Sequence, residues 1–298
     1  MDTEQIRQRR QEIVERFGPW TAHNIRISDD LYTIGARIVG DEVKLRRITQ
    51  IVSDIAGKPL SELRVLDLGS LEGLYAIELA QHGASATAIE VREANLEKIR
   101  FAKEALSLDN LEVICDDVRN LSVEKYGYFD IVLCLGLLYH LDAPDVFYFT
   151  ERVAEVCRIA AIFDTHVSLA DEISQRFKDE VYWGTNFFEH RDDESEEEKK
   201  KKLWSSADNP KSFWFTKPSL NNLLSRVGFT SVYECHNPSE IKKPGDRLTL
   251  VAFKGRRVEL LSSPLMGGCV EERWPEKPPR NESTLKLLLR RTVNKLLK

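Results

Sequence analysis

The chain has 298 residues, a net charge of −5 and a hydrophobic share of 42%. This length suits one large domain with insertions, and the negative charge gives no general attraction to nucleic acid. The five cysteines are scattered without a C-x-x-C pair, which argues against a disulfide framework or a zinc site.

The N-terminal sequence lacks the apolar segment of a signal peptide, and the longest apolar run, 131–139, is too short to cross a membrane. We therefore expect a cytoplasmic protein without a membrane span.

The first 58 residues favour an N-terminal helical cap. Residues 3–17 are charged with sparse apolar positions, which suits a surface helix, and residues 41–56 carry an apolar stripe at helical spacing. An irregular stretch lies between them, where Trp20 and His23 are candidates for the mouth of a substrate pocket.

From residue 64, near-continuous apolar strands alternate with amphipathic helices. This alternation predicts a parallel sheet that is covered on both faces. The expected strands are 64–68, 85–90, 111–115, 129–134 and 158–163. The expected helices are 73–82, 93–106, a short one near 121–125, and 144–157.

Residues 166–213 interrupt this rhythm with a polar, charge-rich stretch that contains many aromatic residues. We predict a loop-rich lid over a substrate pocket. The candidate substrate-binding residues in and beside it are Tyr182, Glu189, His190 and Trp214.

After the insertion, the sheet is expected to resume with a helix at 218–227 and strands at 229–235 and 247–254. The main domain would thus span 59–256. The tail, 257–298, ends in a short basic amphipathic helix that suits docking on the domain or on a partner chain.

Residues 64–75 are the centre of the expected site. A strand stops at Gly69 and a helix begins after Gly73, so free backbone N–H groups point outward from the turn. Gly69 can take a tight turn, and Gly73 lets the helix start lie close to a ligand. Leu71 replaces the middle glycine of a dinucleotide fingerprint, and Asp67 would repel a pyrophosphate, so an NAD oxidoreductase is disfavoured.

Acidic residues follow the next two strands, at the edge of the sheet where ligands bind. Glu90 ends the second strand, where a carboxylate accepts hydrogen bonds from a ribose diol. Asp116 and Asp117 follow the third strand, and either could accept from the amine of an adenine.

These segments together resemble motifs I to IV of the class I S-adenosylmethionine (SAM)-dependent methyltransferases. The matching segments are 65–73, Glu90, Asp117 and 129–136. The likeness covers roughly residues 60 to 165 and 214 to 255. It implies an α/β, Rossmann-like, doubly wound sheet of seven strands in the order 3-2-1-4-5-7-6, with strand 7 antiparallel.

The resemblance also implies SAM as the cofactor. The glycine turn would pack against the methionine part, Glu90 would bind the ribose hydroxyls, and Asp117 with Val118 would bracket the adenine. The residues expected to bind the cofactor are Asp67, Gly69, Ser70, Leu71, Gly73, Glu90, Val91, Asp117, Val118 and Leu135. Leu71 departs from the family pattern, which usually has glycine there, and would crowd the cofactor slightly.

The sulfonium of SAM already makes its methyl group electrophilic, so the protein mainly orients an acceptor and excludes water. An oxygen or nitrogen acceptor loses a proton, and His140 or His166 is placed to take it. Tyr139 would line the acceptor site or close over the methyl group. The competing role for His140 is helix capping or packing.

We therefore expect a SAM-dependent methyltransferase that acts on an oxygen, nitrogen or carbon of a small-molecule acceptor in biosynthesis. The aromatic lid and the net negative charge favour a small molecule as the acceptor. A homodimer is a possible assembly. The dispersed histidines and cysteines indicate no metal site.

The alternative function is a tRNA-modifying methyl- or carboxymethyl-transferase. Residues 136–140 are similar to the segment after motif IV in the transferases that complete 5-oxyacetyl-uridine at the tRNA wobble position. Those enzymes use a carboxylated cofactor, held partly by basic residues. A SAM-binding partner without catalysis is a third alternative, which Glu90 and the strand-end histidines disfavour.

Overall fold

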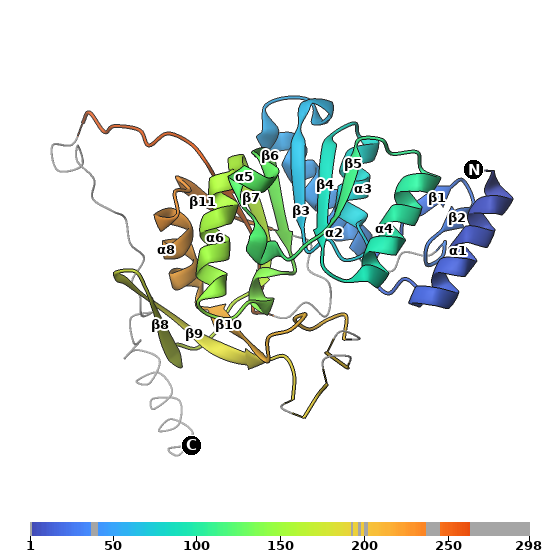
Figure 1. The fold of residues 1–298 in the computed structure, drawn as a ribbon. Coiled ribbons are helices and arrows are strands. Elements are labelled where there is room, and N and C mark those ends of the chain that lie inside the picture. The colour runs from blue at the N-terminus through green and yellow to red at the C-terminus, as the bar shows by residue number, and fades with distance from the viewer. Residues whose placement is uncertain are drawn as a thin grey trace, which may run out of the picture.

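The computed structural model describes residues 2–36, 41–191, 193–195, 198–199, 202–236 and 245–262. Its centre is a seven-stranded sheet in the order β11-β12-β7-β6-β3-β4-β5 (Figure 1). The strands are β3 (Arg64–Leu68), β4 (Ser85–Glu90), β5 (Leu111–Cys115), β6 (Phe129–Leu135), β7 (Cys157–His166), β11 (Ser231–Cys235) and β12 (Arg247–Phe253).

The pairing of these strands is parallel from β5 to β7, and β12 runs antiparallel to both β7 and β11. The predicted fold class, strand order and antiparallel strand are therefore confirmed. The carboxyl ends of β3, β4, β5 and β6 meet at one edge of the sheet, which is where a ligand site is expected.

Helices cover both faces of the sheet, and each face has its own hydrophobic core. The helices packed on one face are α2 (Asp41–Ala56), α3 (Leu74–Gln81) and α4 (Glu93–Ala105). Those on the other face are α5 (Val123–Tyr126), α6 (Asp145–Val156) and α8 (Lys217–Arg226). Three single-turn 3₁₀ helices are η1 (Leu60–Glu62), η2 (Val118–Asn120) and η3 (Leu138–His140).

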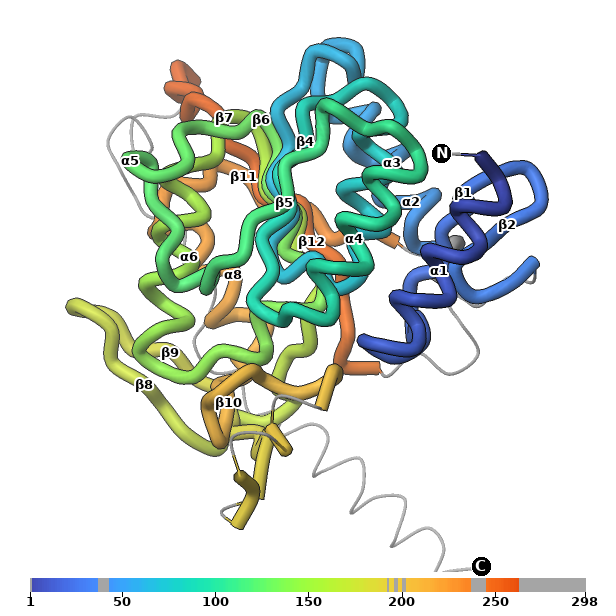
Figure 2. Tube along the Cα trace, turned by 45° about the vertical axis from the view of Figure 1, so that its right-hand side comes forward, coloured from blue at the N-terminus to red at the C-terminus, as the bar shows by residue number. Residues whose placement is uncertain are grey.

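Part of the insertion folds as a second, three-stranded antiparallel sheet, which the sequence analysis did not predict. Its strands are β8 (Ile173–Phe177), β9 (Glu180–Phe188) and β10 (Lys211–Phe215). The small sheet lies beyond one end of the large sheet (Figures 1 and 2).

The aromatic residues of the small sheet explain this difference. Tyr182, Phe213 and Phe215 are buried and pack around Phe147 of α6, with ring centroids 5.2–6.1 Å apart. Gly184 allows the close pairing of β9 with β10, because a Cβ there would lie 2.1 Å from the carbonyl oxygen of Trp214. Half of the aromatic residues of the small sheet thus belong to a core against α6.

The N-terminal segment consists of α1 (Thr3–Phe17) and a short hairpin of β1 (Arg26–Ser28) and β2 (Leu31–Tyr32). Asp2 caps α1 by accepting from the N–H of Gln5, and the side chain of Gln5 accepts from the N–H of Asp2 in return. The predicted helix at the C-terminal end of the chain lies outside the described residues.

A buried ion pair joins this N-terminal segment to the large sheet. Lys98 of α4 donates to the Glu72 carboxylate at 2.9 Å, and both side chains are at most 2% exposed. The same carboxylate accepts from the backbone N–H groups of Thr21, Ala22 and His23. These donors lower the pKa of Glu72, although burial alone would raise it.

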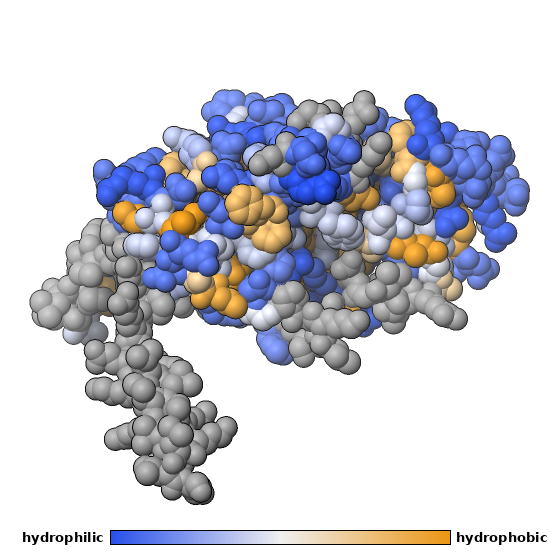
Figure 3. Space-filling view, turned by 90° about the horizontal axis from the view of Figure 1, so that it is seen from below, coloured by the Kyte–Doolittle hydropathy of each residue, from blue (hydrophilic) through white to orange (hydrophobic). Residues whose placement is uncertain are grey.

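None of the described helices is long and apolar enough to cross a membrane. In the space-filling view from below, hydrophobic residues form separate patches divided by hydrophilic ones (Figure 3).

The buried pair generates the first prediction. Lys98→Met leaves the Glu72 carboxylate buried without its counter-ion, so we expect a loss of about 3–5 kcal/mol in the free energy of unfolding. Denaturant titration would measure it. Arg100→Met is the matched control, because Arg100 pairs with Glu93 and Glu97 on the surface of the same helix, where about 1 kcal/mol or less is expected. Equal losses in the two variants would contradict this role of the buried pair.

Candidate active site

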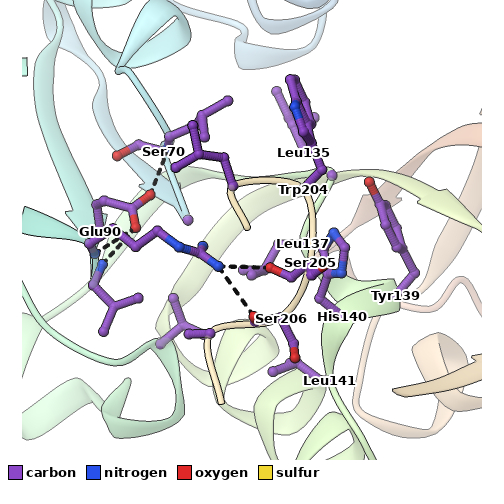
Figure 4. A pocket seen from close by; sticks show the side chains of 18 of the residues that line it. Ser70, Glu90, Leu135, Leu137, Tyr139, His140, Leu141, Trp204, Ser205 and Ser206 are labelled. Atoms are coloured by element: carbon purple, nitrogen blue, oxygen red, sulfur yellow. Dashed lines mark hydrogen bonds between the residues drawn. The ribbon is translucent and has the colours of Figure 1, made fainter. Parts of the chain in front are cut away.

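A pocket of about 270 Å³ opens at the carboxyl ends of β3, β4 and β6. Segment 203–209, which lies between β9 and β10, forms the opposite wall. Figure 4 shows Glu90 on one side of the pocket and Tyr139 with His140 on the other. The predicted cofactor-binding residues that line it are Asp67, Gly69, Ser70, Leu71, Glu90, Val91, Asp117, Val118 and Leu135.

The glycine turn between β3 and α3 takes three left-handed backbone conformations. Gly69, Leu71 and Gly73 have φ angles of +63°, +51° and +83°. The left-handed region costs a residue with a Cβ roughly 1–2 kcal/mol, so Leu71 keeps the backbone shape that glycine would adopt at this position. Its N–H donates to Glu90 Oε2 at 2.9 Å, which fixes the turn against β4.

Gly73 does not line the pocket, so the prediction that it lets the helix start lie close to a ligand was wrong. A Cβ on Gly73 would lie 2.9 Å from Ile99 of α4. The glycine therefore allows close packing of α3 on α4 rather than close approach of a ligand. A Cβ on Gly69 would lie 3.0 Å from Leu137, which does line the pocket.

Glu90 is 4% exposed and its carboxylate is held by three backbone N–H groups, from Leu71, Val91 and Arg92, each at 2.9 Å (Figure 4). Burial raises the pKa of Glu90, and these donors partly offset the rise. Each carboxylate oxygen carries two lone pairs, and Oε1 already accepts from Val91 and Arg92, whereas Oε2 accepts only from Leu71. Glu90 Oε2 can therefore also accept from one hydroxyl of a ribose.

Asp67 and Ser70 present buried polar atoms without partners at the same edge. Asp67 Oδ2 and Ser70 Oγ make no hydrogen bond to the described residues. Burial raises the pKa of Asp67 to about 7. A cationic ligand group would satisfy the Asp67 carboxylate and favour its ionised form.

Asp117 lies at the far end of the pocket and caps η2 through the N–H of Arg119. The Arg119 guanidinium also pairs with Asp117 and with Asp208 of segment 203–209. Asp116 accepts from Lys125 and Tyr126, and these donors lower its pKa to about 2 although burial alone would raise it. Asp117 is thus the acid that joins this end of the pocket to segment 203–209.

His140 and Glu189 form a pair on the other side of the pocket. His140 lines the pocket, and its Nδ1 lies 2.9 Å from Glu189 Oε1. Glu189 also accepts from Ser212 Oγ and from the N–H of Ser206. These donors lower the pKa of Glu189 against the effect of burial, which keeps it an anion beside the imidazole.

His166 does not line the pocket. It lies inside β7, which extends three residues beyond the predicted end of the strand. Its ring stacks on Trp214 at 4.9 Å and meets the edge of Tyr139 at 4.7 Å. Burial lowers its pKa. His166 and Trp214 thus support Tyr139, which lines the pocket, and Trp214 also donates to the Tyr139 carbonyl oxygen.

The other candidate substrate residues lie in different places. His23 lines the pocket, where its Nδ1 accepts from the N–H of Leu74 and burial lowers its pKa to about 4. Trp20 is buried against Phe101, and Tyr182 belongs to the core described above. His190 is buried, with Nε2 3.0 Å from the carbonyl oxygen of Ser206.

Sequence reasoning missed several residues that line the pocket, notably Lys44, Arg92, Arg247 and segment 203–209. Arg92 donates to the carbonyl oxygens of Ser205 and Ser206 (Figure 4). The position of Arg92, two residues after Glu90, was a sequence signal that could have identified it as a pocket residue. Lys44 and Arg247 come from ends of the chain that only the fold brings together.

The sequence profile of the methyltransferase-domain family matches residues 41–234. The chain belongs to this family. Two curated relatives are the ubiquinone biosynthesis O-methyltransferases of Acinetobacter baylyi (31% identical over 102 residues) and Bordetella avium (34% over 94 residues). These alignments cover 34% and 32% of this chain, and 41% and 38% of the relatives, so the chain spans about two fifths of their length.

A solved structure, the N-terminal domain of EvdMO1 in the presence of S-adenosylhomocysteine (SAH) and D-fucose, is 23% identical. It superposes with a TM-score of 0.65 over 86% of this chain and 98% of that one, which supports the fold. The resemblance to class I SAM-dependent methyltransferases is confirmed, and SAM is the cofactor of this methyltransferase.

The described residues fit that cofactor. Unpartnered Asp67 Oδ2 suits the ammonium group of its methionine part, and Glu90 Oε2 suits a ribose hydroxyl. Val118 and the Asp117 carboxylate are available for the adenine. The individual roles of these residues remain predictions, and so does the tRNA-modifying alternative.

The Asp67 carboxyl predicts a pH-dependent affinity for SAH. Because only the ionised carboxylate attracts an ammonium group, and the pKa of Asp67 is about 7, affinity should fall as the pH is lowered. We expect about tenfold weaker binding at pH 6 than at pH 8, measured by calorimetry. Asp67→Asn should bind weakly at both pH values. A pH response that persists in this variant would assign the titration to another group.

Glu90 predicts a second loss of affinity. Glu90→Gln keeps the size of the side chain, but its NH₂ group cannot accept from the backbone donors that hold the carboxylate. We expect SAH affinity to fall by a factor of about 5–150, as for a lost charged hydrogen bond of 1–3 kcal/mol. Calorimetry would measure it, with Glu112→Gln on the neighbouring strand as control. Unchanged affinity in Glu90→Gln would exclude a ribose contact.

Proposed function

We propose that this methyltransferase transfers the methyl group of SAM to a hydroxyl oxygen of a small-molecule acceptor in a biosynthetic reaction. The observation that carries the proposal is the pair of His140 and buried Glu189 at the wall of the pocket. Oxygen as the acceptor atom is supported by the curated relatives, which are named as O-methyltransferases.

His140 is the proposed general base. With Nδ1 donating to Glu189, the lone pair of the neutral imidazole is on Nε2. Nε2 makes no hydrogen bond within the described part of the chain, so it is available to an acceptor hydroxyl. His166 is the weaker candidate, because it lies behind Tyr139 and does not line the pocket.

Glu189 gives His140 its orientation. The carboxylate receives two further hydrogen bonds, so it is fixed before an acceptor arrives. When His140 takes the hydroxyl proton, the imidazolium lies beside this anion, as in the Ser-His-Asp arrangement of hydrolases. Bound SAM supplies a methyl group that is already electrophilic, so proton removal and alignment are the main tasks of the protein.

The insertion is the proposed lid and substrate-binding element. Segment 203–209 lines the pocket, and Arg92 and Arg119 hold it over the cofactor side. Trp204 in this segment is 65% exposed, so its ring is available to cover a bound acceptor. Excluding water in this way would favour transfer to the acceptor.

The pair of His140 and Glu189 predicts a specific kinetic defect. We expect His140→Gln and Glu189→Gln to lower kcat by about 10²–10⁴-fold, the usual contribution of general acid–base catalysis. In His140→Gln, SAH affinity should stay close to that of the wild type. The measurement is SAM-dependent methylation of a panel of small hydroxylated compounds, followed by mass spectrometry.

The chain provides a matched control. His82 and Glu78 form a pair of the same kind at the C-terminal end of α3, at 3.1 Å and partly exposed. His82→Gln and Glu78→Gln should leave kcat unchanged. Wild-type turnover in His140→Gln would remove this residue from the mechanism. If the enzyme methylates tRNA and methylates no small hydroxylated compound, the proposed function is overturned.

A further inference from the structure

The pocket is small for the two ligands that methyl transfer requires. Its volume is about 270 Å³, whereas sites for a single small molecule usually measure about 300–1,000 Å³. SAM and an acceptor must both be bound before the methyl group moves. One wall of the pocket therefore has to move outward when the ligands bind.

Segment 203–209 is the wall that lacks apolar anchors. The opposite wall consists of strand ends, where Leu68 and Ile89 are fully buried in a hydrophobic core. Neither hydrophobic core of the described structure contains a residue of 203–209, and within this range only Ser206 is buried. A segment with few buried apolar contacts opens at a low cost in free energy. The movement is therefore expected in this segment.

Hydrogen bonds from two sides hold the segment in place. Arg92 donates to the carbonyl oxygens of Ser205 and Ser206 at 2.8 and 3.2 Å. At the end of the segment, Asn209 Nδ2 donates to the carbonyl oxygen of His140 at 3.0 Å. These bonds end at backbone carbonyl oxygens, so a substitution elsewhere in the segment leaves their donors and acceptors intact.

Asp208 adds an ion pair at the end of the pocket where Asp117 lies. Its carboxylate pairs with the Arg119 guanidinium, which also holds Asp117. The side chains of Asp208 and Arg119 are 48% and 32% exposed, so solvent reaches the pair. Another acid, Asp145 at the start of α6, lies 3.4 Å from the same guanidinium. The pair of Asp208 with Arg119 thus joins segment 203–209 to the part of the fold that the sheet and its helices fix.

We propose that segment 203–209 is a gate that opens for SAM to enter and for SAH to leave, and that the ion pair of Asp208 with Arg119 is its latch. The latch contains no atom of the cofactor, so it closes the free enzyme and the complex alike. Breaking it makes opening easier in both states by the same factor. The rates of cofactor entry and exit should therefore change together, while the affinity stays constant. The inference rests on the proposed function, because it assigns a movement to the lid described there.

Asp208→Ala tests the latch, and Asp145→Ala is the matched control, because each variant removes one acid from Arg119. Trp204 lies in the segment, so stopped-flow tryptophan fluorescence is suited to measuring the association and dissociation rate constants of SAH. We expect both rate constants to rise about twofold to fivefold in Asp208→Ala, as for the loss of a partly exposed ion pair, with an unchanged Kd. Asp145→Ala should keep both wild-type rate constants.

Hydrogen–deuterium exchange reports the opening itself. In the free enzyme, the peptide that covers 203–209 should exchange about twofold to fivefold faster in Asp208→Ala than in the wild type, because exchange follows the population of the open form. Asp145→Ala should exchange as the wild type does. Peptides from β3 and β4 should exchange equally in all three proteins, which checks that the fold is intact.

Salt provides a third measurement, because it screens an ion pair that solvent reaches. Raising the ionic strength should bring the rate constants of the wild type toward those of Asp208→Ala. Asp145→Ala should keep the salt dependence of the wild type.

Unchanged rate constants in Asp208→Ala would overturn the gate. Faster dissociation with an unchanged association rate and a weaker affinity would also overturn it, because Asp208 would then contact the cofactor itself. The same holds if SAH exchanges faster while hydrogen exchange in 203–209 does not. Failure of the wild type to bind SAH would instead contradict the cofactor site. Turnover of small hydroxylated compounds tests the proposed function independently of these rates.

Discussion

The buried carboxylate of Glu72 is the contact on which the geometry of the cofactor side depends. It lies inside the glycine turn and joins three parts of the chain: the N-terminal segment through three backbone N–H groups, α4 through Lys98, and the turn itself. Burying two charges is costly unless every lone pair and proton has a partner, and here the carboxylate oxygens are fully used. His23 is placed by the same contacts, and it accepts from the N–H of Leu74 at the start of α3.

The two sides of the pocket are built in different ways. The cofactor side uses residues from the ends of adjacent strands and the turns that follow them, so its members are neighbours in sequence or across one strand pair. The acceptor side depends on pairs that are far apart in the chain. His140 and Glu189 are separated by 49 residues, Asp164 and Arg247 by 83, and Lys44 and Asp164 by 120.

This difference explains what the sequence could predict. Strands β3, β4 and β5 were predicted to the residue, because short segments rich in apolar residues that alternate with amphipathic helices favour parallel strands. The pocket position of Glu90 followed from its place at a strand end. The pairing of His140 with Glu189 has no local signal, because it requires the small sheet to pack beside η3, which it does through β10. The small sheet was missed because its aromatic residues were assigned to a lid, whereas half of them fill a core against α6.

Gly73 and Leu71 show the same limit at single positions. Glycine at 73 serves both its left-handed φ of +83° and close packing on Ile99, a residue of the following helix; the second need cannot be read from the turn itself. Leu71 breaks the family pattern in sequence but keeps the left-handed backbone, since its N–H bond to Glu90 holds that conformation. The identity of the side chain was therefore a poor guide to the backbone at Leu71.

Segment 203–209 connects the two sides of the pocket through one continuous chain of hydrogen bonds. The Glu90 carboxylate accepts from the N–H of Arg92, and the Arg92 guanidinium donates to the carbonyl oxygen of Ser206. The N–H of Ser206 donates to Glu189, which in turn holds His140. Ser206 therefore has two roles. It closes the pocket beside Glu90, and it orients the Glu189 carboxylate behind His140. Because a hydrogen bond weakens steeply with distance and angle, a displacement of Ser206 would loosen both contacts at once. The cofactor side and the base side are therefore assembled together rather than independently.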